Sequence, residues 1–512
     1  MDRRPSRDSG PEPKEKENES PKQFEVSFPA RTCSHRRKAS LVMADEPRID
    51  HTDEATACFV HSLIAGEGPM PAKIANFRIS KDKSKLEADI LDKSADAGAG
   101  AHDVAIAEED EDEEPEPDGQ ALPRGKSPAT EAVESRHLTK KQLSDMAWNV
   151  RNLSKKLDSI RLKLNVKSVF LVTKAGDLSV VDATRQVARW LLSKDRGTEY
   201  AVYIENRLRV DPEFDYGGLL DEDASIEPRL KFWDTKLATE QAHLFDLVIA
   251  LGGDGTVLYT SWLFQHIVPP VLSFSLGSLG FLTKFDFNDY QNILSSAIQD
   301  GVLVSLRLRF ECTIMRSNPR SKETPASKKA RDLVDELIGD ESEGSLSHRP
   351  DGVMHILNDI VVDRGPNPTM SSIELFGGDE HFTTLQADGV CISTPTGSTA
   401  YNMAAGGSLT HPDNPVILIT AICAHTLSFR PIILPDTVVL RVGVPYDART
   451  SSWASFDGRQ RVELLPGDYV TVSASRYPFA NVLPQRGRGD DWMRSLSKTL
   501  NWNTRQRQKA MG

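Results

Sequence analysis

Apolar residues recur along this chain with two different periods, and the change of period separates two regions. From Leu138 to Leu164 they stand at helical spacing, which predicts a packed helix where the folded part of the chain begins. Continuous apolar runs at Val166–Thr173, Leu244–Leu251 and Val268–Phe274 predict buried strands, and Asp182–Leu192 predicts a helix between the first two. Strands that alternate with helices indicate an open, largely parallel α/β sheet.

After about residue 300 the pattern changes to short alternating runs separated by glycine and proline turns, which predicts a β-rich second domain. The predicted strands of this domain are Val302–Phe310, Ile356–Asp363, Ser372–Phe376, Val438–Val444 and Tyr469–Ala474. Residues 317–350 have almost no apolar content and predict an unstructured insertion between two strands. The tail Asp491–Gln508 predicts a helix that returns to the first domain.

Charge is distributed unevenly. Residues 1–140 contain 21 Lys and Arg against 30 Asp and Glu, a net charge of −9 out of −12 for the whole chain. The acidic run Glu108–Glu114 repels itself and cannot bury a core, so residues 1–140 are predicted to be mostly disordered, with a solvating or regulatory role. The remaining residues are nearly balanced in charge, which argues against a nucleic acid partner.

The cysteine and hydropathy patterns indicate a reducing compartment. Five dispersed cysteines, without a CxxC pair, are typical of reduced thiols in the cytosol or nucleus, and Cys423 with His425 is too small a set for a zinc site. No apolar run approaches the roughly 18 residues of a membrane span, and the acidic N-terminus is unlike a signal or transit peptide. The sequence therefore predicts a cytoplasmic or nuclear protein without a membrane partner.

The most informative stretch is the apolar run Leu244–Leu251 followed by the turn Gly252–Thr256, which reads Gly-Gly-Asp-Gly-Thr. A strand, a glycine turn and a helix together present backbone N–H groups to a phosphate. An aspartate among those N–H groups would repel the anion, so Asp254 is predicted to accept a proton or to orient a metal ion. The P-loop pattern is absent and the dinucleotide fingerprint fails, since Leu258 occupies the third glycine position.

A second cluster, Asp388–Asn402, combines hydroxyl residues, two glycines, an aspartate and a tyrosine. Gly397 to Thr399 precede a plausible helix start at Ala400, and such an end with hydroxyl caps binds anions. The Tyr401 ring and the Asp388 carboxylate could flank a nucleoside. By itself the cluster fits a ligand loop and a purely structural surface loop equally well, because Ser and Thr also favour turns.

Together these clusters resemble the NAD kinase family, which phosphorylates the adenosine-ribose 2′-hydroxyl of NAD to give NADP. The resemblance covers roughly residues 165 to 505, with features of the animal and fungal branch in the terminal segment. Its motifs, in chain order, are Gly252–Thr256, Gly277–Thr283, Leu357–Asp359, Asp388–Asn402 and Ser455–Arg459. The glycine–aspartate turn alone is weakly specific, since lipid kinases carry a similar one, but the ordered combination is strongly specific.

The resemblance implies an open doubly wound α/β nucleotide domain followed by a β-sandwich domain. The resulting organisation is a disordered acidic regulatory region (1–140), an α/β nucleotide-binding domain (141–290), a β-sandwich NAD-binding domain (291–480) and a helical tail (481–512). It also implies NAD and ATP as substrates, Mg²⁺ brought with ATP, no resident metal ligands, and a homo-oligomer whose neighbouring subunit helps complete the NAD pocket.

Residue roles follow from the same resemblance. Asp254 is the expected base for the attacking hydroxyl, and Asn358 with Asp359 is expected to hold ribose hydroxyls. The other expected nucleotide contacts are Gly252, Gly253, Gly255, Thr256, Asp388, Thr396, Ser398, Thr399, Ala400, Tyr401 and Arg459. Among these, Arg459 is expected to meet a phosphate.

Three further readings stay open. Lys174, after a strand, either contacts a phosphate or is simply solvated, and Arg307 with Arg309 either lines the cleft or faces water. Ser40 follows the basic run Arg36–Lys38 and is either a phosphorylation site or part of an unmodified basic patch.

Two other functions compete with NAD phosphorylation. A lipid kinase of the diacylglycerol or sphingosine type shares the glycine–aspartate turn, but it has no evident use for Asn358–Asp359 and the Ser393–Asn402 loop. A catalytically inactive NAD sensor would not need the Asp254 carboxylate.

Overall fold

The computed structural model describes most of the chain from residue 134 onward. The described residues are 77–78, 134–157, 161–194, 197–277, 280–318, 331–338, 347–426, 428–484 and 491–500. Ser40 and nearly all of the acidic region 1–140 lie outside them. The boundary expected at residue 140 is too late, because a short 3₁₀ turn at Ser135–His137 already belongs to the described fold and the Ser135 N–H donates to Glu311 at 2.6 Å.

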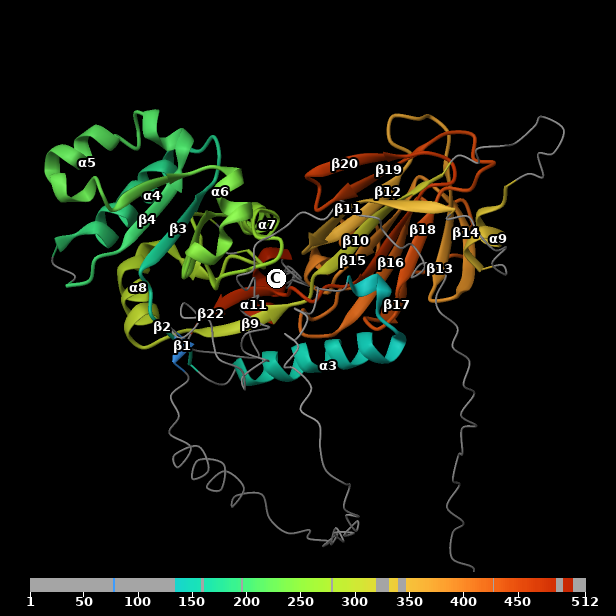
Figure 1. Ribbon diagram of the computed structural model, residues 1–512, viewed down its shortest axis with the longest axis horizontal. Helices are drawn as coiled ribbons and strands as arrows, with labels where there is room; N and C mark the ends of the chain where they lie inside the picture. Colours follow the sequence, from blue (N-terminus) through green and yellow to red (C-terminus); the bar gives the residue numbers. More distant parts are fainter. Residues whose placement is uncertain are drawn as a thin grey trace, which may run out of the picture. The chain divides into compact units, whose positions relative to one another are not determined.

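The first part of the fold is an eight-stranded sheet whose path runs β5-β4-β3-β6-β7-β22-β9, with β8 paired to β7 (Figure 1). Its strands are β3 (Ser168–Thr173), β4 (Ala201–Glu205), β5 (Leu230–Trp233), β6 (Leu247–Gly252), β7 (Val271–Ser275), β8 (Phe285–Asp286), β9 (Leu303–Arg307) and β22 (Phe479–Leu483). Its helices are α4 (Leu178–Leu192), α5 (Tyr216–Glu222), α6 (Thr235–Glu240), α7 (Asp254–Leu263) and α8 (Tyr290–Gln299). Strands β3 to β7 are parallel, as the alternation of strands and helices predicts.

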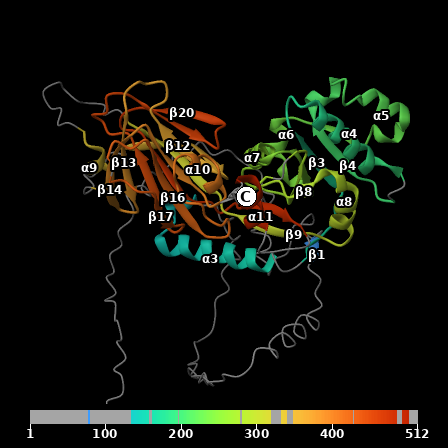
Figure 2. The ribbon, with the colours of Figure 1, turned by 180° about the vertical axis from the view of Figure 1, so that it is seen from behind.

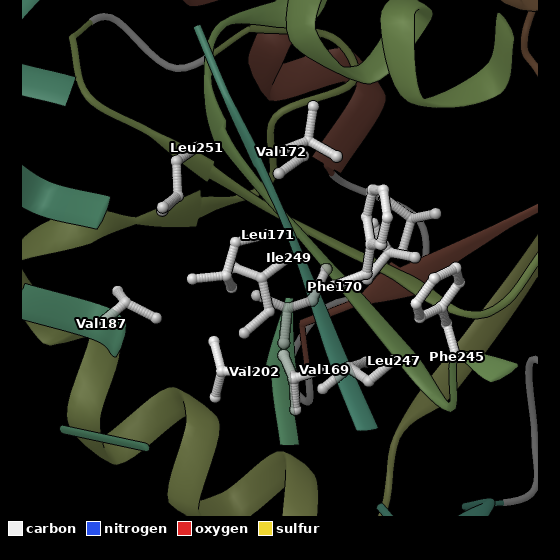
Figure 3. Packing of buried hydrophobic residues seen from close by; sticks show 14 of the residues in the cluster. Val169, Phe170, Leu171, Val172, Val187, Val202, Phe245, Leu247, Ile249 and Leu251 are labelled. Atoms are coloured by element: carbon white, nitrogen blue, oxygen red, sulfur yellow. The ribbon is translucent and has the colours of Figure 1, made fainter. Parts of the chain in front are cut away.

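The central strands β3 and β6 are buried along their whole length, because helices cover a parallel sheet on both faces. Figure 3 shows the apolar side chains of these two strands packed together with Val187 of α4 and Val202 of β4. Aromatic rings extend this core: Phe170 lies 4.5 Å from the Trp233 ring and 4.6 Å from the Phe245 ring. The uninterrupted apolar runs in the sequence therefore correspond to strands buried on both faces.

The second part consists of two six-stranded antiparallel sheets, β11-β10-β21-β18-β13-β14 and β17-β16-β15-β12-β19-β20. Their strands are β10 (Phe310–Ser317), β11 (His348–Ile356), β12 (Asp359–Asp363), β13 (Ser371–Gly377), β14 (Glu380–Ala387), β15 (Gly389–Ser393), β16 (Val416–Ile422), β17 (Ile432–Pro435), β18 (Leu440–Gly443), β19 (Ser452–Phe456), β20 (Gln460–Leu464) and β21 (Tyr469–Ala474). One apolar cluster joins the sheets, since it contains Cys312 and Val442 of the first with Ile360 and Val390 of the second. This is the expected β-sandwich, which Figure 2 shows from behind.

Two strands cross the domain boundaries expected from the sequence. β9, placed in the second domain by those boundaries, pairs with β22 in the first sheet, with Asn481 opposite Ser305. Figure 1 shows β9 in yellow beside β22 in red. The expected boundaries at 290 and 480 are therefore wrong for β9 and for the start of β22, because the chain passes into the sandwich after β9 and returns before β22.

The insertion expected to be unstructured over 317–350 is also corrected in part. Residues 333–338 form the helix α9 (Leu333–Ile338), and Leu333 is 1% exposed against Phe376 and Tyr469. Two leucines spaced four apart give this short segment an apolar face that the surrounding polar composition hides.

Four further elements lie toward the ends of the described chain. The short β1 (Phe77–Arg78) pairs with β2 (Lys163–Leu164). α3 (Lys140–Leu157) is the helix that the apolar spacing over Leu138–Leu164 predicts, but the expected end at Leu164 is wrong, because Lys163–Leu164 form β2. Its Leu143 packs with Val439 and Ala474 of the sandwich, whereas Leu157 belongs to the core of the first sheet. The tail forms α11 (Asp491–Leu500), and the Ser495 hydroxyl donates to the Gly280 carbonyl at 3.3 Å.

Candidate functional site

The strand order of the first sheet reverses between β3 and β6, and two of the predicted site segments follow these strands. In an open α/β sheet, ligands bind outside the carboxyl ends of the strands at such a reversal. Lys174 follows β3 and its N–H donates to Leu251 of β6 at 3.1 Å. The Lys174 side chain is 54% exposed and pairs with Asp177 at 3.0 Å, so it can exchange this surface partner for an anion.

Glycine is required at position 252 by the protein itself. Gly252 has a φ of +150°, and a Cβ there would lie 2.3 Å from the Thr256 hydroxyl oxygen and 3.0 Å from the Lys174 Cβ. Gly253 and Gly255, in contrast, have open space where a side chain would be. The fold does not require glycine at those two positions for lack of space, which is consistent with their serving the close approach of a ligand to the backbone.

The same turn starts α7, with Gly253 as its N-cap and Asp254 as its first residue. The first N–H groups of a helix lack intrahelical partners and carry the positive end of the helix dipole. Thr256 is buried and its N–H closes the turn on the Gly253 carbonyl at 2.9 Å. The turn thus offers an anion site with a carboxylate at its entrance.

The Asp254 carboxylate holds the loop after β7. It accepts hydrogen bonds from the N–H groups of Phe281, Leu282 and Thr283 at 2.8, 3.0 and 3.0 Å, and from the Thr283 hydroxyl at 3.1 Å. Three of these four bonds end on Oδ1, so Oδ2 keeps room to accept a proton from a hydroxyl. Asp254 therefore has a structural role in addition to any chemical one, which sequence reasoning did not foresee.

A second backbone turn, Leu357–Asp359, leads into β12, and Asp457 holds it. The Asp457 carboxylate accepts from the N–H groups of Leu357, Asn358 and Asp359 at 2.8, 2.7 and 3.1 Å, and the Asp457 N–H donates to the Asp359 carbonyl at 2.9 Å. Sequence reasoning quoted Asp457 within a motif without giving it a role. Its signal was an Asp-Gly pair between two strands, which marks a tight hairpin turn.

Asp359 is 6% exposed, and its environment changes its acidity. Burial, followed by the charge of Asp457, raises the pKa of the Asp359 carboxyl from 3.8 to about 7. Asp359 in turn contributes to raising the pKa of the buried Cys391 thiol, after burial itself. A carboxyl with a pKa near neutrality can exist in both protonation states in the cell.

The loop after β15 packs against this turn. The Thr394 N–H and hydroxyl donate to the carbonyls of Asn358 and Leu357 at 2.9 and 2.6 Å, and a Cβ on Gly397 would lie 2.2 Å from the Asn358 carbonyl oxygen. The buried Ser398 hydroxyl donates to the Thr410 carbonyl at 3.0 Å and accepts from its N–H at 3.1 Å, so this hydroxyl serves the loop itself.

The rest of that loop is more open to a ligand. The Thr396 hydroxyl is buried and has no hydrogen-bond partner among the described residues. Thr399 and Ala400 are partly exposed, and Tyr401 is 47% exposed, so its ring can serve as a stacking surface. Burial, with smaller contributions that include Asp359, raises the pKa of Tyr401.

Asp388 lies apart from this group. It precedes β15, whereas the Thr394–Tyr401 loop follows it, and a five-residue strand spans roughly 16 Å. Asp388 instead pairs with Arg364 at 3.1 Å. Within the described residues, no contact joins Asp388 to Asn358 or Asp359.

The arginines are placed differently from expectation. Arg309 is 0% exposed, so the expectation that it lines the cleft or faces water is wrong. Its guanidinium donates to the carbonyls of Tyr477, Phe264 and Gln265 at 2.6, 2.9 and 2.6 Å, and thus caps the carboxyl end of α7. Arg307 is 7% exposed and lies 3.8 Å from Asp413, so it does not face water either.

Arg459 carries a further link to α7. Its guanidinium lies 4.3 Å from the centre of the Tyr259 ring, and Tyr259 is on α7, five residues after Asp254. Cations at this distance from an aromatic face are attracted by the ring quadrupole. The structure thus places Arg459 against the helix that carries Asp254.

Of the helices in the described parts of the chain, none has the length and apolar character that crossing a bilayer requires.

Comparison with known proteins assigns the family. The ATP-NAD kinase N-terminal domain matches residues 169–302, and the ATP-NAD kinase C-terminal domain matches residues 357–483. An uncharacterised kinase of Schizosaccharomyces pombe is 44% identical over 361 residues, covering 70% of this chain and 86% of its own length. An NAD(+) kinase of Saccharomyces cerevisiae is 41% identical, covering 72% of this chain and 66% of its own length.

A solved structure agrees with these matches. The crystal structure of yeast NADH kinase complexed with NADH is similar to this fold, with a TM-score of 0.53, 28% sequence identity, and coverage of 69% of this chain and 93% of that one. Both domains, their order and the two motif-bearing turns are accounted for by one family, and the chain belongs to the ATP-NAD kinase family.

Proposed function

We propose that the protein transfers the γ-phosphoryl group of ATP to the adenosine-ribose 2′-hydroxyl of NAD, producing NADP and ADP. The observation that carries this proposal is the Gly252–Thr256 turn. It combines the start of helix α7 with a carboxylate whose Oδ2 accepts just one of its four hydrogen bonds, at the ligand-binding edge of the sheet. Membership of the ATP-NAD kinase family supports it.

In this reaction the 2′-hydroxyl oxygen forms a bond to the γ-phosphorus while the bond from that phosphorus to the β–γ bridging oxygen breaks, and ADP leaves with the electron pair. The hydroxyl proton passes to Asp254. Because the transition state of phosphoryl transfer is loose, the proton can leave late, and orientation of the hydroxyl matters more than basicity. The N–H groups of Gly253 and Gly255 and the start of α7 would bind the phosphate oxygens, with Lys174 in reach of the same edge.

The second turn would hold the sugar. Asn358 offers donor and acceptor groups, and an ionised Asp359 accepts hydroxyl protons. The Thr396, Thr399 and Tyr401 side chains would line the base and ribose, and Asp388 would contact the far end of the dinucleotide.

ATP supplies the divalent ion. The described residues contain no group of three or more His, Cys, Asp or Glu side chains that could hold a metal ion by itself. Mg²⁺ usually keeps phosphate oxygens and water as most of its ligands, so it fits a site with the single carboxylate Asp254. When bound, it would screen the charge of the phosphates.

The test is transfer of labelled phosphate from γ-labelled ATP by the purified full chain. The acceptors are NAD, NADH, diacylglycerol and sphingosine in parallel, with polyphosphate as an alternative donor. We expect label in NADP, or in NADPH if the reduced dinucleotide is preferred. Label in a lipid would support a lipid kinase, and tight NAD binding without transfer would support a sensor.

We also propose a homo-oligomer in the cytosol or nucleus, with a neighbouring subunit completing the dinucleotide site. Analytical ultracentrifugation of the full chain and microscopy of a tagged chain test these two points. A monomer with full activity, or a chain found in an organelle, would contradict them.

A further inference from the structure

The hairpin turn between β19 and β20 touches both halves of the proposed site. Its central residues Asp457 and Gly458 have positive φ angles of +48° and +66°. The Arg459 N–H closes the turn by donating to the Phe456 carbonyl at 2.9 Å. Turns with two left-handed residues are tight and have a defined twist, so the side chains on either side of Gly458 leave it in fixed directions.

On one side, Asp457 fixes the turn that carries the expected sugar ligands. Its carboxylate accepts three consecutive N–H groups, from Leu357 to Asp359, at 2.7–3.1 Å. Charge-assisted hydrogen bonds of this kind are stronger than neutral ones and define geometry. The backbone positions of Asn358 and Asp359 therefore depend on the position of the hairpin.

On the other side, Arg459 fixes the hairpin to α7. Its guanidinium stacks on Tyr259 at 4.3 Å, and the Tyr259 ring is itself stacked on Trp262 at 6.0 Å. Helix α7 spans ten residues, and its carboxyl end is held by the buried Arg309. A shift of the hairpin would therefore be resisted by a helix that is anchored elsewhere.

We propose that the Asp457–Arg459 turn aligns the helix carrying Asp254 with the turn carrying Asn358 and Asp359, and that Asp457 and Arg459 are positioning residues of the reaction. This inference rests on the proposed function. It specifies how the ATP site and the NAD site of that function are kept in position relative to each other. Phosphoryl transfer depends mainly on positioning, so a small misplacement lowers the rate more than the affinity.

The sequence favoured a different role for Arg459, a direct phosphate contact. The two roles predict different partners. An arginine that binds phosphate should act independently of Tyr259, and its loss should raise KM for a substrate. An arginine that aligns the site should act through Tyr259, and its loss should lower kcat.

The experiment is a double-mutant cycle with Arg459→Ala and Tyr259→Leu, and with Tyr259→Phe as the matched control that keeps the ring. Each disruptive single variant should lower kcat for NAD phosphorylation about two- to thirtyfold, the range of a cation–π contact. KM for ATP should be nearly unchanged. The kcat of the double variant should be no lower than that of the less active single variant, because both changes break the same contact. Tyr259→Phe should have the kcat of the wild type. Additive effects, or a change confined to KM, would overturn the proposal.

A second measurement does not depend on activity. Amide hydrogen exchange of the full chain should speed up in the peptide containing Leu357–Asp359 when Tyr259 is replaced by Leu, although the two segments are far apart in sequence. Unchanged exchange there would overturn the alignment. The two proposals can also fail separately. If the wild type does not phosphorylate NAD but the Tyr259→Leu variant still exchanges faster at Leu357–Asp359, the proposed function is refuted and the link between α7 and this turn stands.

Discussion

Asp254 and Asp457 each hold a backbone turn through their carboxylates, but the groups around the two carboxylates differ. Each carboxylate accepts hydrogen bonds from three consecutive backbone N–H groups, at 2.8–3.0 Å for Asp254 and 2.7–3.1 Å for Asp457. Asp254 begins a helix next to glycines with open space, whereas Asp457 sits in a hairpin turn beside a second carboxyl group, Asp359.

The difference shows that holding a loop does not identify a catalytic aspartate. What separates the two is the environment on the free side of each carboxylate. At Asp254 that side offers a helix N-terminus and glycines that admit a ligand. At Asp457 both carboxylate oxygens accept N–H groups of the 357–359 turn, which makes Asp457 a support for Asp359 and not a second base.

The largest effect is expected for Asp254→Asn. Removing a general base typically lowers a rate by ~10²–10⁴-fold, so kcat should fall by about that factor while NAD binding persists or tightens. The amide cannot accept from all three N–H groups, because its NH₂ group would face one of them. Unfolding midpoints and NAD affinity must therefore be measured on the same sample, and near-wild-type turnover would make Asp254 a structural residue like Asp457.

Asp359→Ala should raise KM for NAD by roughly ten- to a hundredfold, the range of a lost hydrogen bond to a charged group. KM for ATP should stay nearly constant, because the ribose contacts belong to the acceptor. Steady-state kinetics with each substrate varied in turn provides the measurement. A change in the ATP constant alone would contradict the assignment of this turn to NAD.

Asp457→Asn should lower the free energy of unfolding by about 1 to 3 kcal/mol, the cost of an N–H group left without its acceptor. Urea unfolding measures this value. Asp447→Asn, the same change at an exposed turn, is the control and should be nearly neutral. If the two substitutions cost the same, Asp457 does not hold the 357–359 turn.

Asp359→Asn should change how stability depends on pH. The folded-state pKa of Asp359 is about 7 against an ordinary value of 3.8, so the folded protein binds this proton more tightly than the unfolded chain. That contribution is complete below about pH 4 and is lost as the pH rises through 7. The variant lacks it and should gain stability relative to the wild type as the pH rises from about 4 to about 7.

Thermal unfolding of both proteins across this pH range provides the check. The groups that act on or respond to Asp359 here are Asp457, Cys391 and Tyr401. A stability difference that does not vary with pH would show that Asp359 is ionised in the fold at all these pH values.

The smallest effect is expected for Thr283→Val, which removes the one hydroxyl that donates to Asp254, at 3.1 Å. Asp457 has no equivalent donor among its hydrogen bonds in the described structure. The change also removes the acceptor of the Gly280 N–H, which donates to the Thr283 hydroxyl at 3.0 Å, so it tests both bonds of this hydroxyl. We expect kcat to fall about two- to fivefold, a small effect for a hydrogen bond to a carboxylate, because three N–H groups still hold Asp254. A fall in kcat of more than a hundredfold would mean that the position of the loop after β7, and not the Asp254 carboxylate, governs the rate.

The sequence predicted much of the fold because its strands are of two clear types. The continuous runs that became β3 and β6 and the alternating runs that became the sandwich strands differ in period. The return of β22 to the first sheet was not predictable in this way, since the apolar pattern of a five-residue strand does not indicate which sheet it joins. The short strands β4 and β5 were missed: β5 has four residues with Lys231 among them, and the apolar run of β4 ends after Ile204.

For the site, motif spacing identified Asp254 and Asp359 but not their partners. Asp457 holds backbone N–H groups a hundred positions earlier in the chain, and Arg309 caps a helix that ends more than forty positions before it. Such contacts depend on tertiary structure, and the local sequence around an arginine or an aspartate looks the same whether its partner is water or a distant carbonyl.

The place of β22 has a consequence for synthesis of the protein. Strand β9 joins the first sheet only through β22, which inserts between β7 and β9. On the ribosome, more than 170 residues emerge between β9 and its partner. The part of the β7 edge at Val271 that will receive β22 stays open meanwhile, since β8 pairs with Phe274 and Ser275 of that strand. The nucleotide domain is therefore completed only after every strand of the sandwich has been synthesised, so a premature stop within the sandwich would damage both domains and release a chain with an unpaired strand edge.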